Sequence, residues 1–257
     1  MTDNPLLDAH RRARFFEIFE SVPRGGPGDP ESTRRALAMM VDLPAQPRVL
    51  DLGCGPGAGS TNLASLTGGR VTALDLHAPF AVQQAAAARA AGLAHRLDPV
   101  CADMGAAPLA SGVFDLVWSE GALYSIGFRR GLEVCRRLVR PGGVIAVSEA
   151  VWTAPEPPGE VARWWTAAYA DIASIDEKAD AVRESGFDIV GHFTLPREAW
   201  WDYLYVPIRT RLDGLREAWA GDEAGLEVIA EFDTEIAMYE RWGHTYSYEF
   251  FVARRPG

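Results

Sequence analysis

Residues 49–60, VLDLGCGPGAGS, decide the fold of this chain. An apolar run ends at an aspartate, and four glycines follow within seven positions (Gly53, Gly55, Gly57 and Gly59). Glycine loses more conformational entropy on folding than any other residue, so such a cluster is costly unless the backbone geometry requires it. A strand that runs through Gly-x-Gly-x-Gly into a helix presents its backbone N–H groups to a ligand without obstruction by side chains. The stretch therefore predicts a strand, a loop and a helix that together bind a ligand.

Strand-like apolar runs alternate with helical stretches on both sides of this loop. Strands are expected at 48–52, 70–76, 114–119 and 143–149, and helices at 60–66, 81–93 and 131–139. This alternation predicts a parallel sheet with right-handed crossovers. Beyond it, Ser174 and Glu177 form a capping box for a helix, 187–195 and 246–254 resemble strands, and 197–219 and 226–242 resemble helices. Before it, Asp29 and Pro30 are typical of a helix start.

Composition limits the classes of function. The formal net charge is -10, which argues against a protein that must neutralise many phosphates of a nucleic acid. The three cysteines form neither a zinc pattern nor a disulfide framework, and the five histidines show no metal-ligand spacing. No leader-like segment or membrane-length apolar run is present. We therefore expect a cytoplasmic protein without metal, nucleic-acid or membrane partners, and the sequence leaves open whether it forms a homodimer.

The glycine loop suits two kinds of ligand. Gly53, Gly55 and Ala58 fit the Gly-x-Gly-x-x-Gly/Ala fingerprint of dinucleotide sites, and Asp75 at the end of the next strand could hold a ribose hydroxyl. A sulfonium nucleoside, S-adenosylmethionine, needs the same features. Asp51 favours the second ligand, because its carboxylate would attract an ammonium or sulfonium group and would repel a pyrophosphate. The fingerprint alone leaves a dehydrogenase as the alternative.

Four ordered elements together resemble the class I S-adenosylmethionine-dependent methyltransferases over residues 47–150. These are the glycine loop, Asp75, the segment CADMGAAPL at 101–109 and LVRPGGVIAVSE at 138–149. The resemblance implies an α/β, Rossmann-like sheet of seven mostly parallel strands with helices on both faces and the last strand antiparallel. It also implies that S-adenosyl-L-methionine is the cofactor, with the methionine end along the glycine loop, the ribose at Asp75 and the adenine at Asp103 and Met104. The cofactor-binding residues expected on this basis are Asp51, Gly53, Gly55, Gly57, Asp75, Leu76, Asp103, Met104 and Ser119.

Segments outside this core predict how an acceptor binds. PRGGPG (23–28), SEGALYSIGF (119–128) and HFTLP (192–196) followed by Trp-Trp are similar to a bacterial group of small-molecule methyltransferases, in which Gln usually stands at the position of Gly25. Seven of the eight tryptophans and six of the seven tyrosines lie after residue 150. We expect a helical lid over residues 1–46 and a methyltransferase domain over 47–257, with helical acceptor-side insertions at about 152–185 and 197–242.

The segment that follows the predicted strand 114–119 is where open α/β sheets place their substrates. It carries Glu120 and Tyr124, which we expect to orient the acceptor or take its proton; alternatively, Glu120 contacts only the cofactor and Tyr124 only packs. The function predicted is methyl transfer to a small, aromatic or otherwise apolar acceptor molecule. One alternative is an RNA or protein methyltransferase, which would need a basic groove or an Asn-Pro-Pro-Tyr-type motif, and SEGALY at 119–124 is neither. The other alternative is a cofactor-binding module without catalysis.

Overall fold

A single sheet organises the computed structural model, which describes residues 5–257, with side chains from residue 9 onward. Within this part the strand order is β3-β2-β1-β4-β5-β8-β7, and a short β6 pairs with β5 beside this path. The strands are β1 (Arg48–Leu52), β2 (Arg70–Asp75), β3 (Leu97–Cys101), β4 (Phe114–Glu120), β5 (Val139–Trp152), β6 (Ala173–Ser174), β7 (Asp188–Thr194) and β8 (Tyr246–Arg254). β8 runs antiparallel to β5 and β7, and the other pairs are parallel. The predicted mostly parallel sheet with an antiparallel last strand is confirmed, and β6 is an addition that the sequence did not predict.

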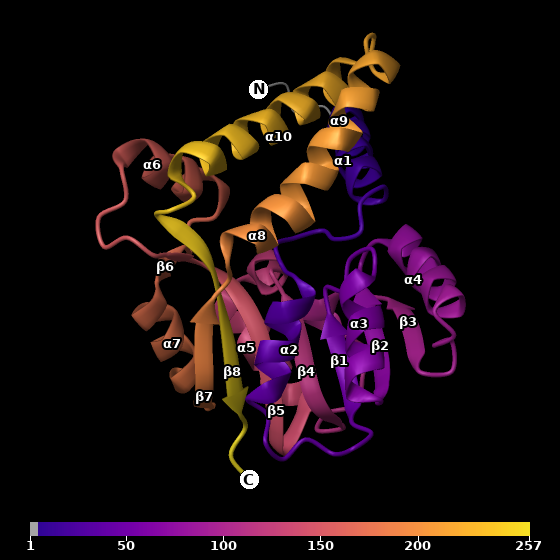
Figure 1. Ribbon diagram of the computed structural model, residues 1–257, viewed down its shortest axis with the longest axis vertical. Helices are drawn as coiled ribbons and strands as arrows, with labels where there is room; N and C mark the ends of the chain where they lie inside the picture. Colours follow the sequence, from indigo (N-terminus) through magenta and orange to yellow (C-terminus); the bar gives the residue numbers. More distant parts are fainter. Residues whose placement is uncertain (1–4) are drawn as a thin grey trace.

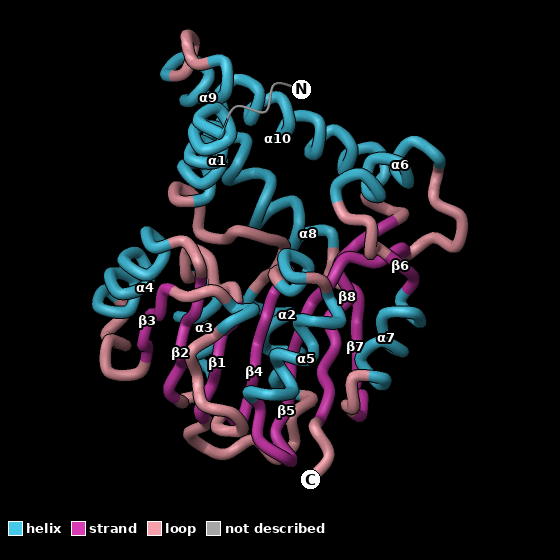
Figure 2. The backbone as a smooth tube through the Cα atoms, turned by 180° about the vertical axis from the view of Figure 1, so that it is seen from behind, coloured by secondary structure: helices cyan, strands magenta, loops and turns pink. Residues whose placement is uncertain are grey.

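Helices cover both faces of the sheet and also form a layer above it (Figures 1 and 2). They are α1 (Pro5–Phe19), α2 (Pro30–Ala38), α3 (Ala58–Thr67), α4 (Ala78–Ala90), α5 (Phe128–Leu138), α6 (Gly159–Ala168), α7 (Ile175–Glu184), α8 (Arg197–Trp200), α9 (Val206–Ala218) and α10 (Glu223–Trp242). A π-helical turn, Trp201–Tyr205, joins α8 to α9, and two short 3-10 turns span Met104–Ala106 and Leu123–Ile126.

Two hydrophobic cores form because the strands alternate their side chains between the two faces of the sheet. On one face, Val49 packs in a cluster with Leu63 of α3 and Ala36 of α2. On the other face, Leu50 packs in a cluster with residues of α5 and α7, including Leu132. Burial on both sides explains why these strands read as continuous apolar runs in the sequence.

The layer of α1, α6, α8, α9 and α10, which we call the cap, lies above the carboxyl ends of the parallel strands (Figure 1). Phe15 of α1 stacks on Phe232 of α10 with ring centroids 5.7 Å apart, and Arg14 donates to Asp222 at 2.6 Å. The expected lid over residues 1–46 is thus divided, since α1 belongs to the cap while α2 packs against α3. The expected insertion at 152–185 is divided as well, because α7 covers the sheet.

Two findings concern only the residues that the structure describes. No helix among them is long and apolar enough to cross a membrane. Their His, Cys, Asp and Glu side chains form no group of three or more that could hold a metal ion.

Asp29 is the N-cap of α2, as its sequence predicted, and its removal should destabilise the fold. Its side chain is buried and accepts hydrogen bonds from the backbone N–H groups of Glu31 and Ser32, both at 2.8 Å. We expect Asp29→Ala to lower the free energy of unfolding by about 1–2 kcal/mol, as for other lost caps. Urea denaturation would measure this. Asp29→Asn keeps an acceptor and should retain most of the stability; equal losses in both variants would show that the carboxylate acts through its charge instead.

Candidate functional site

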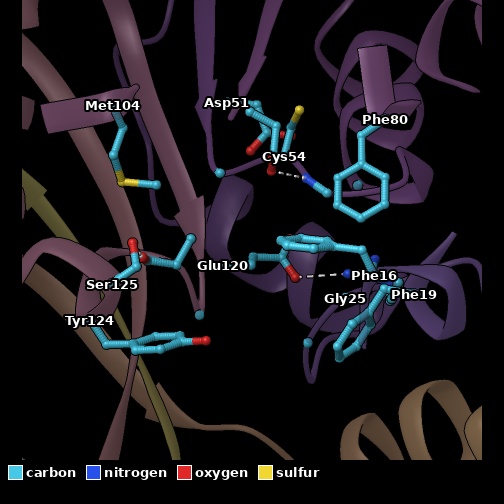
Figure 3. Close-up of a pocket in the computed structure, with 18 of the residues that line it drawn as sticks. Phe16, Phe19, Gly25, Asp51, Cys54, Phe80, Met104, Glu120, Tyr124 and Ser125 are labelled. Carbon is cyan, nitrogen blue, oxygen red and sulfur yellow. Dashed lines mark hydrogen bonds and ion pairs between the residues drawn. The ribbon is translucent and has the colours of Figure 1, made fainter. Parts of the chain in front are cut away.

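A cavity of about 250 Å³ opens where the carboxyl ends of β1, β2 and β4 meet, below α1 (Figure 3). The chain leaves β1 toward β2 on one side and β4 follows on the other, so this is the point where the strand order reverses and open α/β sheets bind ligands. The side chains and glycines that line it are Phe15, Phe16, Phe19, Arg24, Gly25, Gly26, Asp51, Gly53, Cys54, Gly55, Gly59, Asp75, Phe80, Met104, Glu120, Gly121, Ala122, Tyr124 and Ser125.

The glycine loop forms one wall of the cavity. Gly53 and Gly55 have φ angles of 71° and 57°, in the region that favours glycine. A Cβ at Gly53 would come within 2.3 Å of the Ala122 Cβ, so a side chain cannot be accommodated there. Gly57, with φ 115°, instead faces Gln84 of α4, whose Cδ would lie 2.7 Å from a Cβ at Gly57. Two of the three predicted glycines therefore line the cavity, and the third makes room for a buried glutamine.

Gln84 is a residue that sequence reasoning missed. It is fully buried, and its Nε2 donates to the Gly55 carbonyl at 3.1 Å and to Ser60 Oγ at 3.2 Å. These bonds hold the glycine loop against the first turn of α3. The signal in the sequence is the pair Gln83 and Gln84 in an otherwise alanine-rich helix. A glutamine on the buried face of such a helix needs hydrogen-bond partners there, because a buried amide without partners is costly.

Asp51 lies at the base of the cavity and is almost completely buried. Its Oδ2 accepts a hydrogen bond of 2.6 Å from Ser60 Oγ. Burial raises the pKa of Asp51 to about 7, and the carboxylate of Glu120 adds to this while Ser60 and Arg24 oppose it. Near neutral pH, without a ligand, this carboxyl is therefore partly protonated, and a cation placed beside it would favour its charged form.

Asp75 lines the cavity on the side of β2. One oxygen accepts from the Gly55 N–H and the other from the His77 N–H, both at 2.9 Å. The carboxylate thus fixes the glycine loop to the end of β2. Each oxygen keeps a lone pair with which it can accept from a ligand hydroxyl.

Four of the predicted cofactor residues lie outside the lining of this cavity. Gly57 faces Gln84, and Leu76 is exposed at 58%. Asp103 is exposed and caps the turn at Met104–Ala106, where it accepts from the Gly105 N–H at 2.7 Å. Ser119 is buried and donates to the Leu52 carbonyl at 2.8 Å. Their role in cofactor binding stays a prediction, whereas Met104 does line the cavity.

Glu120 lies at the end of β4, with its carboxylate near Asp51 and the first turn of α3, and is held by two donors. Arg24 Nη1 donates to its Oε2 and Trp118 Nε1 to its Oε1, both at 2.8 Å. The Arg24 and Glu120 side chains are only 9% and 13% exposed. Sequence reasoning missed this ion pair, because nothing in the sequence indicates that the segment 20–29 returns to the end of β4.

Tyr124 points its hydroxyl into the cavity, although its ring is half-exposed (Figure 3). Burial, with smaller contributions from the carboxylates of Glu235 and Glu149, raises the pKa of Tyr124 above its ordinary value. The phenol therefore stays protonated at neutral pH and is suited to donate a hydrogen bond.

A buried polar cluster lies behind Tyr124. The Tyr169 ring packs edge-on against it, with centroids 5.8 Å apart, and Lys178 Nζ donates to the Tyr169 hydroxyl at 2.9 Å. Burial lowers the pKa of Lys178 and raises that of the nearby Glu149 to about 7. This cluster is a second feature that sequence reasoning missed, and it supports Tyr124 from outside the cavity.

Phenylalanine rings form the roof of the cavity. Phe16 of α1 stacks on His77 with centroids 4.0 Å apart, and it meets Phe80 of α4 edge-on at 6.2 Å. His77 Nε2 in turn lies 2.6 Å from Glu20 Oε1. These contacts bring α1 down onto the end of β2 and the start of α4, so the roof is apolar while the floor is acidic.

The residues present fit a cationic ligand with an amino-acid end. Asp51, Asp75 and Glu120 bring three carboxylates into the cavity beside one guanidinium, that of Arg24. A pyrophosphate would face this acidic wall at high electrostatic cost, which argues against the dinucleotide alternative. Because Gly55 carries no side chain, a ligand in the cavity can approach its backbone.

Comparisons with known proteins agree with this geometry. Residues 49–143 match the family described as "Methyltransferase domain". The chain is similar to the malonyl-[acyl-carrier protein] O-methyltransferase of Enterobacter lignolyticus (strain SCF1), with 40% identity over 153 residues, 58% of this chain and 54% of that protein. It is also similar to the 27-O-demethylrifamycin SV methyltransferase of Amycolatopsis mediterranei (strain S699), with 27% identity over 235 residues, 86% of this chain and 81% of that protein.

A solved structure extends the likeness to the cap. A SAM-dependent methyltransferase from Thiobacillus denitrificans, in complex with S-adenosyl-L-homocysteine, superposes with a TM-score of 0.79 at 27% identity over 93% of this chain and 97% of that one. The chain spans only about half the length of the first curated relative named above. The matches therefore confirm the fold expected from the sequence and a methyltransferase domain over residues 49–143, and they leave the acceptor to be inferred from the site.

The burial of Asp51 predicts a pH-dependent stability. The pKa of Asp51 is about 7 in the folded protein, against an ordinary value of 3.8. Between pH 3.8 and about pH 7, the folded state therefore keeps a proton on Asp51 that the unfolded chain has lost. The ligand-free protein should therefore lose stability as the pH rises through this window. We expect Asp51→Asn to be more stable than the parent at about pH 8, by up to about 4 kcal/mol, with the difference vanishing near pH 4.

Urea denaturation across this pH range would measure the difference. Glu149, whose pKa burial also raises to about 7, supplies the slope that remains in the variant. Asp98→Asn, at an exposed ion pair with Arg70, is the matched control and should follow the parent. If Asp51→Asn kept the parent's full pH dependence, Asp51 would be ionised throughout.

Proposed function

We propose that this chain is a class I S-adenosylmethionine-dependent methyltransferase that transfers a methyl group from S-adenosylmethionine to a small acceptor with an aromatic or otherwise apolar part. The observation that carries the proposal is the single cavity in which the glycine loop and its carboxylates face Tyr124, Ser125 and the rings of α1. A cofactor site and an acceptor site thus share one space, as a direct transfer between two bound molecules requires.

The two walls of the cavity differ in chemistry. The carboxylates of Asp51 and Asp75 suit the ammonium and ribose ends of the cofactor. Phe15, Phe16 and Phe19 supply an apolar surface on the opposite side, against which a ring or an alkyl chain would lose its water. The relative from Amycolatopsis mediterranei, named for a rifamycin substrate, matches most of this chain and supports a small-molecule acceptor.

The residues of the cavity position and shield the reactants. S-adenosylmethionine supplies a methyl carbon already activated by its positive sulfur, so the main contribution of the protein is alignment and exclusion of water. Tyr124, protonated at neutral pH, donates a hydrogen bond that orients the acceptor. Glu120 lies on the same side and can accept from an acceptor hydroxyl or ammonium through its remaining lone pairs. Phe16 and Phe19 close the roof.

The alternatives make different demands on the surface and the chemistry. An RNA or protein methyltransferase needs an extended basic or peptide-binding groove beside the cofactor, whereas this cavity has an acidic floor and an apolar roof. A cofactor-binding module would bind S-adenosylmethionine and leave its methyl group in place. The cytoplasmic location, a homodimer and the absence of a nucleic-acid partner belong to the proposal as well.

Methyl loss from the cofactor tests the function directly. The protein is titrated with S-adenosylhomocysteine by calorimetry and then incubated with methyl-labelled S-adenosylmethionine and a panel of small aromatic and apolar acceptors. We expect binding and transfer of label to at least one small molecule. Label transferred instead to RNA or to protein would favour those alternatives, and binding without any methyl loss would favour the module.

Asp75→Ala should weaken the binding of S-adenosylhomocysteine by about 1.5–3 kcal/mol, the range for hydrogen bonds of charged groups. The variant loses both an acceptor for the ribose and the anchor of the Gly55 N–H. Calorimetric titration measures the change, and Asp75→Asn, which keeps one acceptor oxygen, should lose less. An unchanged dissociation constant in Asp75→Ala, at unchanged fold stability, would remove Asp75 from the ribose role.

The segment from α1 to the start of α2 should act as a lid. It carries Phe16 and Arg24 into the cavity, and the run PRGGPG allows it to hinge. We expect hydrogen exchange at residues 8–30 to slow when S-adenosylhomocysteine is added. The amides of α7, on the far side of the sheet, serve as the internal reference. If 8–30 exchanged equally with and without ligand while the glycine loop became protected, the segment would be a fixed cover.

A further inference from the structure

Arg24 has an unusual position for an arginine. It lies in the segment between α1 and α2, yet its side chain is 9% exposed and projects into the cavity. Among the described residues that line the cavity, no other carries a lysine or arginine side chain. A buried cation at such a site is costly unless it is paired, and here its partner is Glu120 at 2.8 Å.

The pair stands beside the glycine loop. A Cβ at Gly59, in the first turn of α3, would lie 3.9 Å from both Asp51 Oδ2 and Glu120 Oε1, so these two carboxylates approach the same point. A Cβ at Gly55 would lie 3.8 Å from the Gly25 backbone nitrogen. The segment that carries Arg24 is therefore in close contact with the part of the loop where the methionine end of the cofactor is expected.

The backbone around Arg24 is fitted to the ion pair. A Cβ at Gly28 would overlap Glu120 Oε2 and lie 2.7 Å from Arg24 Nη1, so a side chain at this position would displace the ion pair. The Gly28 N–H donates to the Ala199 carbonyl of α8 at 3.2 Å, which ties this point to the cap. The approach of the chain to Arg24 and Glu120 is thus held from two sides.

Arg24 keeps most of its binding capacity in this arrangement. A guanidinium has five N–H donors in a planar fork that matches a carboxylate, and the bond to Glu120 uses one of them. Glu120 already accepts hydrogen bonds from Arg24 and Trp118. Its carboxylate and that of Asp51 still have lone pairs that can accept from a ligand in the cavity. A positive and a negative group thus face one cavity side by side, which is the pattern that recognises a zwitterion.

We propose that Arg24 binds the α-carboxylate of the cofactor's amino-acid end, while Glu120 and Asp51 bind its α-ammonium. The proposal rests on the proposed function, because it concerns the same cofactor. It makes Arg24 a specificity residue for ligands that carry an amino-acid end, contributed by the lid segment and not by the sheet. In the absence of the cofactor, the pairing of Arg24 with Glu120 keeps both charges satisfied.

Two ligands that differ only at the amino-acid end test this assignment. S-adenosylhomocysteine carries the carboxylate and ammonium, whereas 5′-deoxy-5′-methylthioadenosine is a nucleoside thioether that lacks both. We expect Arg24→Gln to weaken the binding of S-adenosylhomocysteine by roughly tenfold to a hundredfold and to leave the binding of methylthioadenosine unchanged. Calorimetric titration of both ligands gives the ratio.

Two further variants keep the test decisive. Arg34→Gln removes a similar charge from an exposed pair with Glu31 on α2 and should change neither ligand. The double variant Arg24→Gln/Glu120→Gln removes both charges of the pair, so no unpaired Glu120 carboxylate is left to destabilise the fold. We expect the double variant to lose binding of S-adenosylhomocysteine and to keep binding of methylthioadenosine, as the single variant does. Thermal unfolding of each protein confirms that it is folded.

The outcomes separate the two proposals. An equal loss for both ligands would mean that Arg24 only holds the lid, and no loss would mean that it does not contact the cofactor; either result overturns the inference while the proposed function stands. If the unmodified protein bound S-adenosylhomocysteine but never released the methyl group of S-adenosylmethionine, the proposed function would fail and the ratio would still decide the role of Arg24. If it bound neither ligand, both proposals would fail.

Discussion

Three carboxylates share one crevice in this protein, and their mutual repulsion is the constraint on which the site depends. Asp51, Asp75 and Glu120 converge at the ends of β1, β2 and β4, where Asp51 is buried and the other two are partly buried. The protein manages the charge in three ways. Asp51 holds a proton up to about pH 7, Asp75 accepts two backbone N–H groups, and Glu120 pairs with Arg24. Each arrangement leaves capacity for a ligand that brings positive charge.

The roof of the crevice depends on the cap as much as on the sheet. Phe15 and Phe19 of α1 each contact Phe232 of α10, while Phe16 reaches down to His77 at the start of α4. Movement of α1 would therefore disturb aromatic contacts at both ends. The ion pair of Arg24 and the bond from Gly28 to Ala199 add polar contacts to the same segment. Opening of the site is thus coupled to the packing of the helices of the cap.

Local signals were sufficient to predict the sheet and the floor of the site. Asp51 and Asp75 end apolar runs, and the carboxyl ends of neighbouring parallel strands must meet at one edge, so their convergence follows from the pattern alone. The alternation along β4 turns the Ser119 side chain into the core, where it donates to the Leu52 carbonyl, and its role in cofactor binding stays a prediction. Arg24 and Phe16 were missed as site residues. Their contacts join segments far apart in the sequence, and no local pattern encodes how a linker returns across a sheet.

The bond between Gly28 and Ala199 has a consequence for how such a chain can diversify. The strand ends and the glycine loop carry the residues proposed to bind the cofactor, so a change there would affect every reaction that uses it. The inner face of α1 lines the cavity through the apolar rings of Phe15, Phe16 and Phe19, and Phe232 of α10 packs against Phe15 and Phe19. Mutations on these faces can reshape the proposed acceptor space while the glycine loop and its carboxylates stay unchanged. Gly28 connects the two parts, because it lies beside the pair of Arg24 and Glu120 and its N–H donates to Ala199 of the cap. Selection for new acceptors can therefore act on the helices of the cap while this contact is kept.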